Sequence, residues 1–262
     1  MQLIDTHCHL DFPVFDETRE VQLAAWRQLG VGEYIIPAVG EENWGRVMAL
    51  ADQHAGMAYG LGIHPWHVGT QREGTLTRLR SLLASQPRGL VAVGECGLDL
   101  RSQVPQAGQV ESFEAQVKLA MEFDLPLIVH SVRANDSVAK ILRRLKPARG
   151  GVIHAFGGSL QQAQTFWRLG FRLGIGGVIS YERANKTREA VRAMPLEALL
   201  LETDAPDMPL QGQQAGPNTP ASLLTIIQLL AQLRQQQLAD VASVLRESTL
   251  QAFPRLDMAF NT

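Results

Sequence analysis

A short segment near the start of the chain, THCHLD at positions 6–11, holds two histidines separated by one residue. Side chains two positions apart in a strand point to the same side, so His7 and His9 face together while Cys8 faces away. Two adjacent imidazoles can coordinate one metal ion together. Histidine pairs also occur as hydrogen-bonded core residues, so this motif by itself leaves both interpretations open.

More histidines and carboxylates follow other short apolar segments. Six of the seven histidines lie at or just after the end of such a segment, and only His54 does not. Buried carboxylates are costly unless they are paired or bind a metal, so packing alone explains such a set poorly. The set predicts a metal site whose ligands are His7, His9, Glu95, His130, His154 and Asp204.

Six ligands are too many for one zinc ion with an open position, which usually has three protein ligands. They suit two divalent cations roughly 3.5–4 Å apart, joined by a bridging carboxylate. Glu95 is the expected bridge. We expect one cation on His7, His9 and Asp204, and the other on His130 and His154. Imidazole and carboxylate ligands accept Zn, Mn, Co or Ni and, more weakly, Mg.

The elements that must position these residues are eight apolar segments of strand length, which alternate with segments of helical periodicity. The expected strands are Leu3–Thr6, Glu33–Val39, Met57–Ile63, Leu90–Glu95, Pro126–His130, Gly151–His154, Phe171–Ile175 and Ala198–Thr203. The expected helices are Thr18–Leu29, Glu42–Gln53, Thr75–Ala84, Gln109–Glu122, Ser137–Leu145, Leu160–Arg168, Thr187–Met194, Pro220–Gln235 and Leu238–Ala252.

Strands joined by single helices form right-handed parallel crossovers, and eight of them predict an α/β fold of the (β/α)8 TIM-barrel type. An open doubly wound sheet is the alternative. No Gly-, Ser- or Pro-rich linker divides the chain, so we expect a single domain over residues 1–262. In a barrel the carboxyl ends of the strands meet at one mouth, which would bring the candidate ligands together.

Composition sets further limits. The formal net charge of −2 provides no general attraction to nucleic acid or to membranes. No segment approaches the ~18 apolar residues of a membrane span, and no basic region precedes an apolar run at the N-terminus. Two cysteines without a CxxC motif suit a reducing compartment. These features predict a cytoplasmic protein with no membrane association and no evident obligate protein partner.

The chain resembles the TatD family of metal-dependent deoxyribonucleases, within the amidohydrolase-like barrels. The stretches that carry the resemblance are Asp5–Asp11, Gly62–Pro65, Gly94–Asp99, Leu125–Ser131, His154–Gly158 and Glu202–Pro206. The resemblance implies a two-metal hydrolase acting on DNA or another phosphodiester, as a 3′-5′ exonuclease-like enzyme. Three positions that would border the substrate depart from the family pattern: Leu100, Val132 and Asp207.

Roles within this expected site follow from chemistry. Asp204 would orient the attacking water and take its proton, and Glu95 would bridge the metals. Glu202 and Asp99 would orient ligand histidines, although Asp99 also fits a simple turn residue.

Substrate contacts are expected from residues near the strand ends. His64 would contact substrate or leaving group, with packing in a rigid turn before Pro65 as the alternative. Arg101, Arg133 and Arg183 are candidate phosphate contacts by their position. A surface arginine is more often simply solvated, which is the alternative for each of them.

Two other functions compete with the nuclease. One is a barrel hydrolase of amide, ester or lactone bonds in a small molecule. Such enzymes often bridge their metals with a carboxylated lysine, but none of the chain's four lysines lies at a strand end. The other is a non-catalytic metal-binding protein, which the presence of a carboxylate placed to act as base argues against.

Overall fold

The computed structural model describes residues 1–260, so the last two residues of the expected domain lie outside the described residues. Eight parallel strands form one sheet in the order in which they occur along the chain, as in a TIM barrel. The strands are β1 (Leu3–Asp5), β2 (Val31–Pro37), β3 (Met57–Leu61), β4 (Leu90–Asp99), β5 (Leu127–Val132), β6 (Gly151–Ile153), β7 (Phe171–Ile175) and β8 (Leu199–Leu201). The predicted fold class is confirmed.

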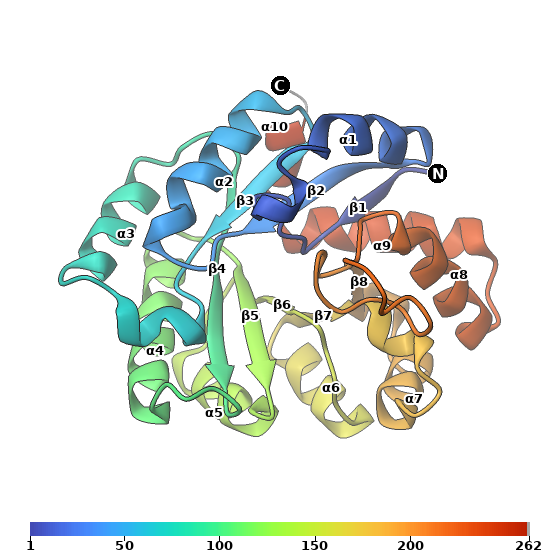
Figure 1. Ribbon diagram of the computed structural model, residues 1–262. Helices are drawn as coiled ribbons and strands as arrows, with labels where there is room; N and C mark the ends of the chain where they lie inside the picture. Colours follow the sequence, from blue (N-terminus) through green and yellow to red (C-terminus); the bar gives the residue numbers. More distant parts are fainter. Residues whose placement is uncertain (261–262) are drawn as a thin grey trace.

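Helices connect the strands and surround the sheet (Figure 1). They are α1 (Arg19–Gln28), α2 (Glu41–Gln53), α3 (Thr75–Ala84), α4 (Gln106–Glu122), α5 (Asn135–Leu145), α6 (Leu160–Arg168), α7 (Asn185–Ala193), α8 (Ser222–Arg234), α9 (Leu238–Ala252) and α10 (Leu256–Phe260). Short 3-10 helices occur at Pro13–Phe15, Pro65–Thr70, Gly177–Ser180 and Leu196–Ala198. All nine expected helices are present with small changes in their bounds, whereas α10 was not expected.

The barrel closes where the chain leaves β1 and β8. The Thr6 backbone N–H donates to the Leu201 carbonyl at 2.9 Å, and the Asp204 N–H donates to the His7 carbonyl at 2.8 Å. The first and last strands are therefore joined at their carboxyl ends. This junction brings the segment that contains His7 beside the segment that contains Asp204.

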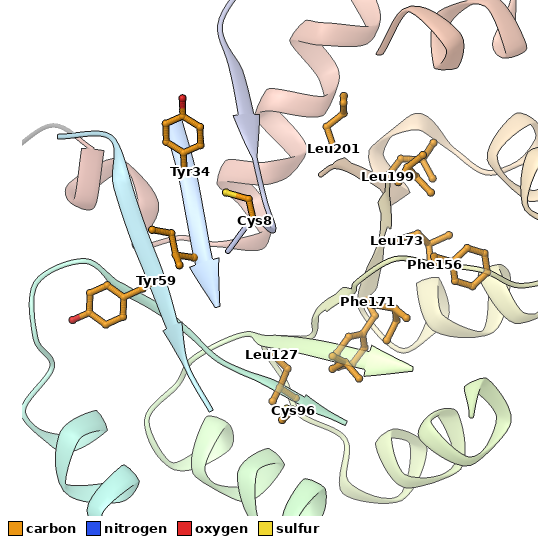
Figure 2. Packing of buried hydrophobic residues seen from close by; sticks show 14 of the residues in the cluster. Cys8, Tyr34, Tyr59, Cys96, Leu127, Phe156, Phe171, Leu173, Leu199 and Leu201 are labelled. Carbon is orange, nitrogen blue, oxygen red and sulfur yellow. The ribbon is translucent and has the colours of Figure 1, made fainter. Parts of the chain in front are cut away.

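The core consists of two buried apolar layers. The larger lies between strands and helices and includes Cys8 and Cys96, both fully buried and unpaired by disulfides (Figure 2). Both cysteines thus pack in the core, as expected from strand alternation. The smaller layer joins inward-facing strand residues such as Ile35 and Val91 to Phe253 and Leu256. The end of α9 and α10 therefore pack against the amino-terminal end of the barrel.

Strand β4 differs from its prediction because it continues past Glu95 to Asp99. Between Val93 and Cys96 the strand advances by one residue more than β5 does, which is a β-bulge around Glu95. Bulges of this kind redirect a side chain beside functional sites. Gly97 permits the extension, because it has φ +143° and any Cβ would lie 2.0 Å from the His130 carbonyl oxygen.

Among the described residues, none of the helices combines the length and the apolar character that a membrane span requires.

Candidate metal centre

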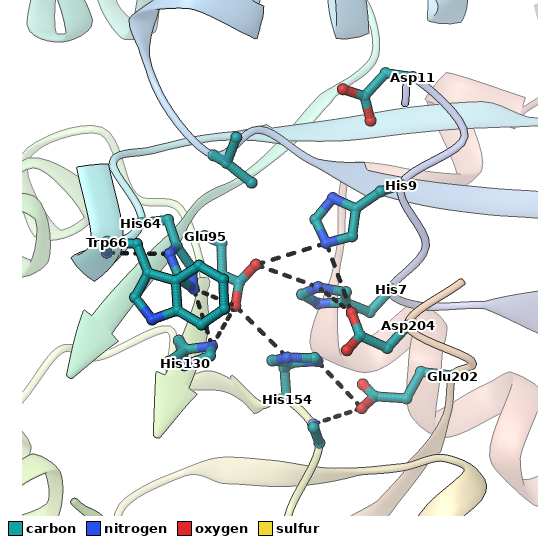
Figure 3. A network of polar contacts seen from close by, with 12 residues as sticks. His7, His9, Asp11, His64, Trp66, Glu95, His130, His154, Glu202 and Asp204 are labelled. Atoms are coloured by element: carbon teal, nitrogen blue, oxygen red, sulfur yellow. Dashed lines mark hydrogen bonds and ion pairs between the residues drawn. The ribbon is translucent and has the colours of Figure 1, made fainter. Parts of the chain in front are cut away.

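All six predicted ligands lie at the carboxyl end of the barrel, together with His64 (Figure 3). His7 and His9 follow β1, His64 follows β3, Glu95 lies within β4, His130 lies within β5, His154 follows β6 and Asp204 follows β8. Every one of these residues except Asp204 is at most 8% exposed. The barrel thus gathers into one small volume side chains that are up to about two hundred positions apart.

Glu95 lies at the middle of the cluster, and its two oxygens face different histidines. Oε2 lies 3.3 Å from Nε2 of His7 and 3.9 Å from Nε2 of His9. Asp204 Oδ1 lies 3.6 Å from each of the same two nitrogens. Ligand atoms that share a cation at about 2.1 Å are separated by roughly 3–3.5 Å, so this spacing suits a shared divalent cation. We name His7, His9, Asp204 and Glu95 Oε2 the first ligand group.

The other oxygen of Glu95 faces the remaining histidines. Oε1 lies 2.8 Å from Nδ1 of His130, 3.5 Å from Nε2 of His154 and 3.7 Å from Nε2 of His64. Nε2 of His64 is also 3.2 Å from Nδ1 of His130. His130, His154 and Glu95 Oε1 form the second ligand group. His64 lies beside this group, but its Nδ1 accepts a hydrogen bond from the Trp66 N–H at 3.2 Å, so a neutral His64 ring carries its proton on Nε2. Its expected role as a substrate contact, or as a packed residue of the turn before Pro65, stays a prediction.

Unpartnered polar atoms show that the cluster suits cations. Both ring nitrogens of His7 and Nδ1 of His9 are buried without a hydrogen-bond partner. Leaving such groups unsatisfied costs free energy, which a bound cation removes. Three sets have ligand atoms within 4.8 Å of one another: His7, His9 and Glu95; His64, Glu95 and His130; and His7, His154 and Glu202. The donor set therefore fits divalent cations.

Electrostatics keep the central carboxylates ionised. Burial by itself raises the pKa of Glu95, but the surrounding imidazoles, His7 and His154 first, hold it well below its usual range. Burial also raises the pKa of Asp204, and the His154 charge again outweighs it, so the net shift is downward. Burial lowers the pKa of His154, whereas Asp204 and Glu95 raise it to about 10. The cluster thus combines carboxylates with imidazoles that hold protons, and bound metal ions would replace those protons.

Two carboxylates outside the ligand groups hold candidate ligand histidines. Glu202 Oε1 accepts a hydrogen bond from the Ala155 N–H and lies 3.3 Å from Nδ1 of His154. Asp99 Oδ2 lies 3.3 Å from Nε2 of His130. Asp99 also makes the turn contact expected of the alternative, since its Oδ1 accepts from the Arg101 N–H at 2.8 Å. Such partners fix the orientation of metal-binding imidazoles.

A third carboxylate was not singled out by the sequence. Asp5 is fully buried and accepts hydrogen bonds from the Thr203 N–H at 3.0 Å, from the Thr203 hydroxyl at 2.6 Å and from the His7 N–H at 3.3 Å. It ties the end of β1 to the end of β8, and so holds His7 beside Asp204. An acid at the end of an apolar strand was the available signal.

The predicted arginines follow β4, β5 and β7 along the chain. Arg101 Nε is 3.9 Å from Asp99 Oδ1, and 59% of its side chain is exposed. Arg133 is exposed just after β5, with φ +53°. Arg183 lies over the ring of Tyr181 at 5.1 Å. The role of these residues as phosphate contacts remains a prediction.

Comparison with known proteins gives matches over nearly the whole chain. Residues 4–254 match the family described as TatD related DNase. An uncharacterized metal-dependent hydrolase of Escherichia coli, YjjV, is 44% identical, over 96% of this chain and 98% of its own. A crystal structure of this TatD homologue superposes with a TM-score of 0.94 at 43% identity, covering 96% of this chain and 98% of the other. A Pantoea protein named 3′-5′ ssDNA/RNA exonuclease TatD is 31% identical, over 96% of this chain and 99% of its own.

Proposed function

The chain belongs to the family of TatD-related DNases, which are metal-dependent hydrolases, and from this we propose that it is a two-metal phosphodiesterase that trims single-stranded DNA from the 3′ end. One observation carries the two-metal part of the proposal. Glu95 lies between two ligand groups and presents one oxygen to each, as a bridging carboxylate would. The substrate is supported by the name of the Pantoea exonuclease at moderate identity.

Each residue has a defined task in this proposal. The first ligand group would hold one cation, and the second group would hold the other. Cations bound there supply an acidified water as nucleophile and offset the negative charge that develops on the phosphate. Glu202 and Asp99 keep the rings of His154 and His130 in position.

Asp204 is the proposed base. It is the most open of the carboxylates in the two ligand groups, with 15% of its side chain exposed against 3% for Glu95. Its lowered pKa keeps it as a proton acceptor at neutral pH. Its backbone N–H is bonded to the His7 carbonyl, which fixes the carboxylate beside the first ligand group. The proposed compartment is the cytoplasm, in keeping with two buried free thiols.

The test is cleavage of a 5′-labelled single-stranded oligonucleotide by purified protein. The protein is stripped of metal and then supplied with Mg²⁺, Mn²⁺ or Zn²⁺. Trimming from the 3′ end gives a ladder of shortening labelled products, whereas trimming from the 5′ end releases labelled mononucleotide at once. Asp204→Asn should lower kcat by roughly 10²–10⁴-fold. Asp124→Asn makes the same change at an exposed acid that pairs with Arg149, in the turns that precede β5 and β6, and should leave cleavage unchanged.

The outcomes are distinct. Metal-dependent shortening that Asp204→Asn abolishes supports the proposal. Turnover of a generic ester or phosphodiester without any cleavage of DNA would retain a metal hydrolase but refute the DNA substrate. It would favour hydrolysis of a small molecule. Bound metal without turnover of any ester would refute the enzyme itself.

A further inference from the structure

Trp66 exposes an aromatic face at the edge of the metal centre. Of the four tryptophans, Trp26 and Trp44 are 5% and 4% exposed and Trp167 is partly buried, whereas Trp66 is 57% exposed. Exposure of an indole is unfavourable by the hydrophobic effect. Trp66 lies in the loop after β3, at the carboxyl end of the barrel where the ligand groups are found. An exposed indole at this position can bind a flat apolar ligand by stacking.

The indole is held firmly. Its Nε1–H donates to Asp99 Oδ2 at 2.8 Å, and the same oxygen lies 3.3 Å from Nε2 of His130. Its ring meets the His64 ring edge-on, with centroids 5.2 Å apart and an angle of 89°. The Trp66 backbone N–H donates to Nδ1 of His64 at 3.2 Å, in a 3-10 helix that begins at Pro65. A ring fixed at so many points loses little conformational entropy when a ligand stacks on it.

The ring is also close to the reacting position. One side chain, His64, lies between Trp66 and Glu95. The His64 ring contacts the indole, and its Nε2 lies 3.7 Å from Glu95 Oε1. In DNA a base is joined to its phosphate through one sugar. A phosphodiester at the second ligand group would therefore place a neighbouring base within reach of the indole.

We propose that Trp66 is the stacking platform for the nucleobase beside the scissile phosphodiester, and thus selects unpaired nucleic acid. The proposal rests on the proposed function, because it assumes a DNA strand at the metal centre. Stacking uses the π-face that every base has, so Trp66 would provide affinity without sequence preference. Paired bases are stacked within a duplex and do not offer a free face, so the platform favours a single strand or an unpaired 3′ end.

Two substitutions separate stacking from the hydrogen bond to Asp99. Trp66→Phe keeps an aromatic face but removes the Nε1–H, and Trp66→Leu removes both. Binding is measured by fluorescence anisotropy of a labelled single-stranded oligonucleotide in the Asp204→Asn background with Mn²⁺ present, and cleavage kinetics are measured in the otherwise unchanged protein. A second oligonucleotide carries base-free tetrahydrofuran nucleotides at its last two 3′ positions.

Trp66→Leu should weaken binding and raise KM about 10-fold for the normal oligonucleotide, with little change in kcat. Trp66→Phe should stay within about threefold of the parent protein, since an aromatic face remains. Both substitutions should have no effect on the base-free oligonucleotide. Metal content measured by mass spectrometry should be equal in all three proteins.

Other outcomes overturn the proposal. If Trp66→Leu impairs both oligonucleotides equally, or lowers kcat with KM unchanged, Trp66 acts only through Asp99 and His130. If Trp66→Leu has no effect while DNA is cleaved, the stacking role fails and the proposed function stands. If DNA is bound through Trp66 but not cleaved, the proposed function fails and the stacking role stands. If the protein neither binds nor cleaves DNA, both fail.

Discussion

A single added methyl group should disturb the metal centre without touching any ligand. Gly174 lies in β7, and a Cβ at this position would lie 2.0 Å from Oε2 and 2.5 Å from Cδ of Glu202. Real Cβ contacts essentially never fall below 3.0 Å. In Gly174→Ala the Glu202 carboxylate must therefore retreat by about 1 Å. Glu202 is 1% exposed and has little room in which to do so.

The magnitude follows from what Glu202 holds. Its Oε1 lies 3.3 Å from Nδ1 of His154, so a shift of about 1 Å breaks this contact and the bond from the Ala155 N–H. Loss of a partner that orients a metal-binding histidine typically costs 10–100-fold in metal affinity or activity. Overpacking of the site adds about 1–3 kcal/mol of destabilisation. We expect the affinity for the cation on His154 to fall by about 30-fold.

The assay is titration of the metal-stripped protein with Zn²⁺ or Mn²⁺ by calorimetry, with thermal unfolding measured in parallel. Gly176→Ala is the matched control, since its Cβ would lie no closer than 3.3 Å to any atom of Glu202. It should bind metal normally. A double-mutant cycle adds Glu202→Ala, which removes the side chain that collides. Gly174→Ala should then cause no further loss of metal affinity.

Two results would refute this reasoning. One is unchanged metal affinity in Gly174→Ala, which would mean that Glu202 does not orient His154. The other is an equal loss of affinity in the presence and in the absence of the Glu202 side chain, which would locate the effect in the backbone of β7. A loss of stability alone would show overpacking without a role in the metal centre.

The remaining predictions concern protonation and the base of the barrel. Burial lowers the pKa of His154 but Asp204 and Glu95 raise it to about 10, so in metal-stripped protein its stabilising charge is complete below pH 6.5 and disappears as the pH rises to 10. The Tm of the metal-stripped parent protein should exceed that of metal-stripped His154→Gln, by an amount that shrinks across that pH range. Metal affinity should rise with pH. A difference in Tm that grows with pH would contradict the argument. Leu256→Ala truncates a fully buried residue of the smaller apolar layer and should lower the unfolding free energy by about 2–5 kcal/mol in urea titrations. Val21→Ala, on the exposed face of α1, should change the unfolding free energy little. Equal effects of the two substitutions would exclude α10 as part of the core.

The sequence determined the fold and supplied the candidate ligand set, whose members the structure brings together. Alternation of strand-length and helix-length periodicity is a local property, since each element buries its own apolar face, so the eight strands could be located from nearby residues alone. The pairing of His7 with His9 was also predicted from strand alternation, although both residues lie just after the end of β1. The position of Glu95 was predicted as a strand end, which was wrong, because the bulge and the close approach at Gly97 depend on β5 rather than on β4.

Tertiary structure decided how these residues meet. The contacts of Trp66 with Asp99, of Glu202 with His154 and of Asp5 with Thr203 join residues 33 or more positions apart. The sequence does not indicate which of these residues pair, because the distances between their side chains depend on the register between neighbouring strands and on the closure of β1 on β8. His64 likewise lies beside the second ligand group because the barrel brings β3 and β5 to one mouth. The sequence by itself determined which side chains are available for chemistry, and the closed barrel decided which atoms of those side chains face one another.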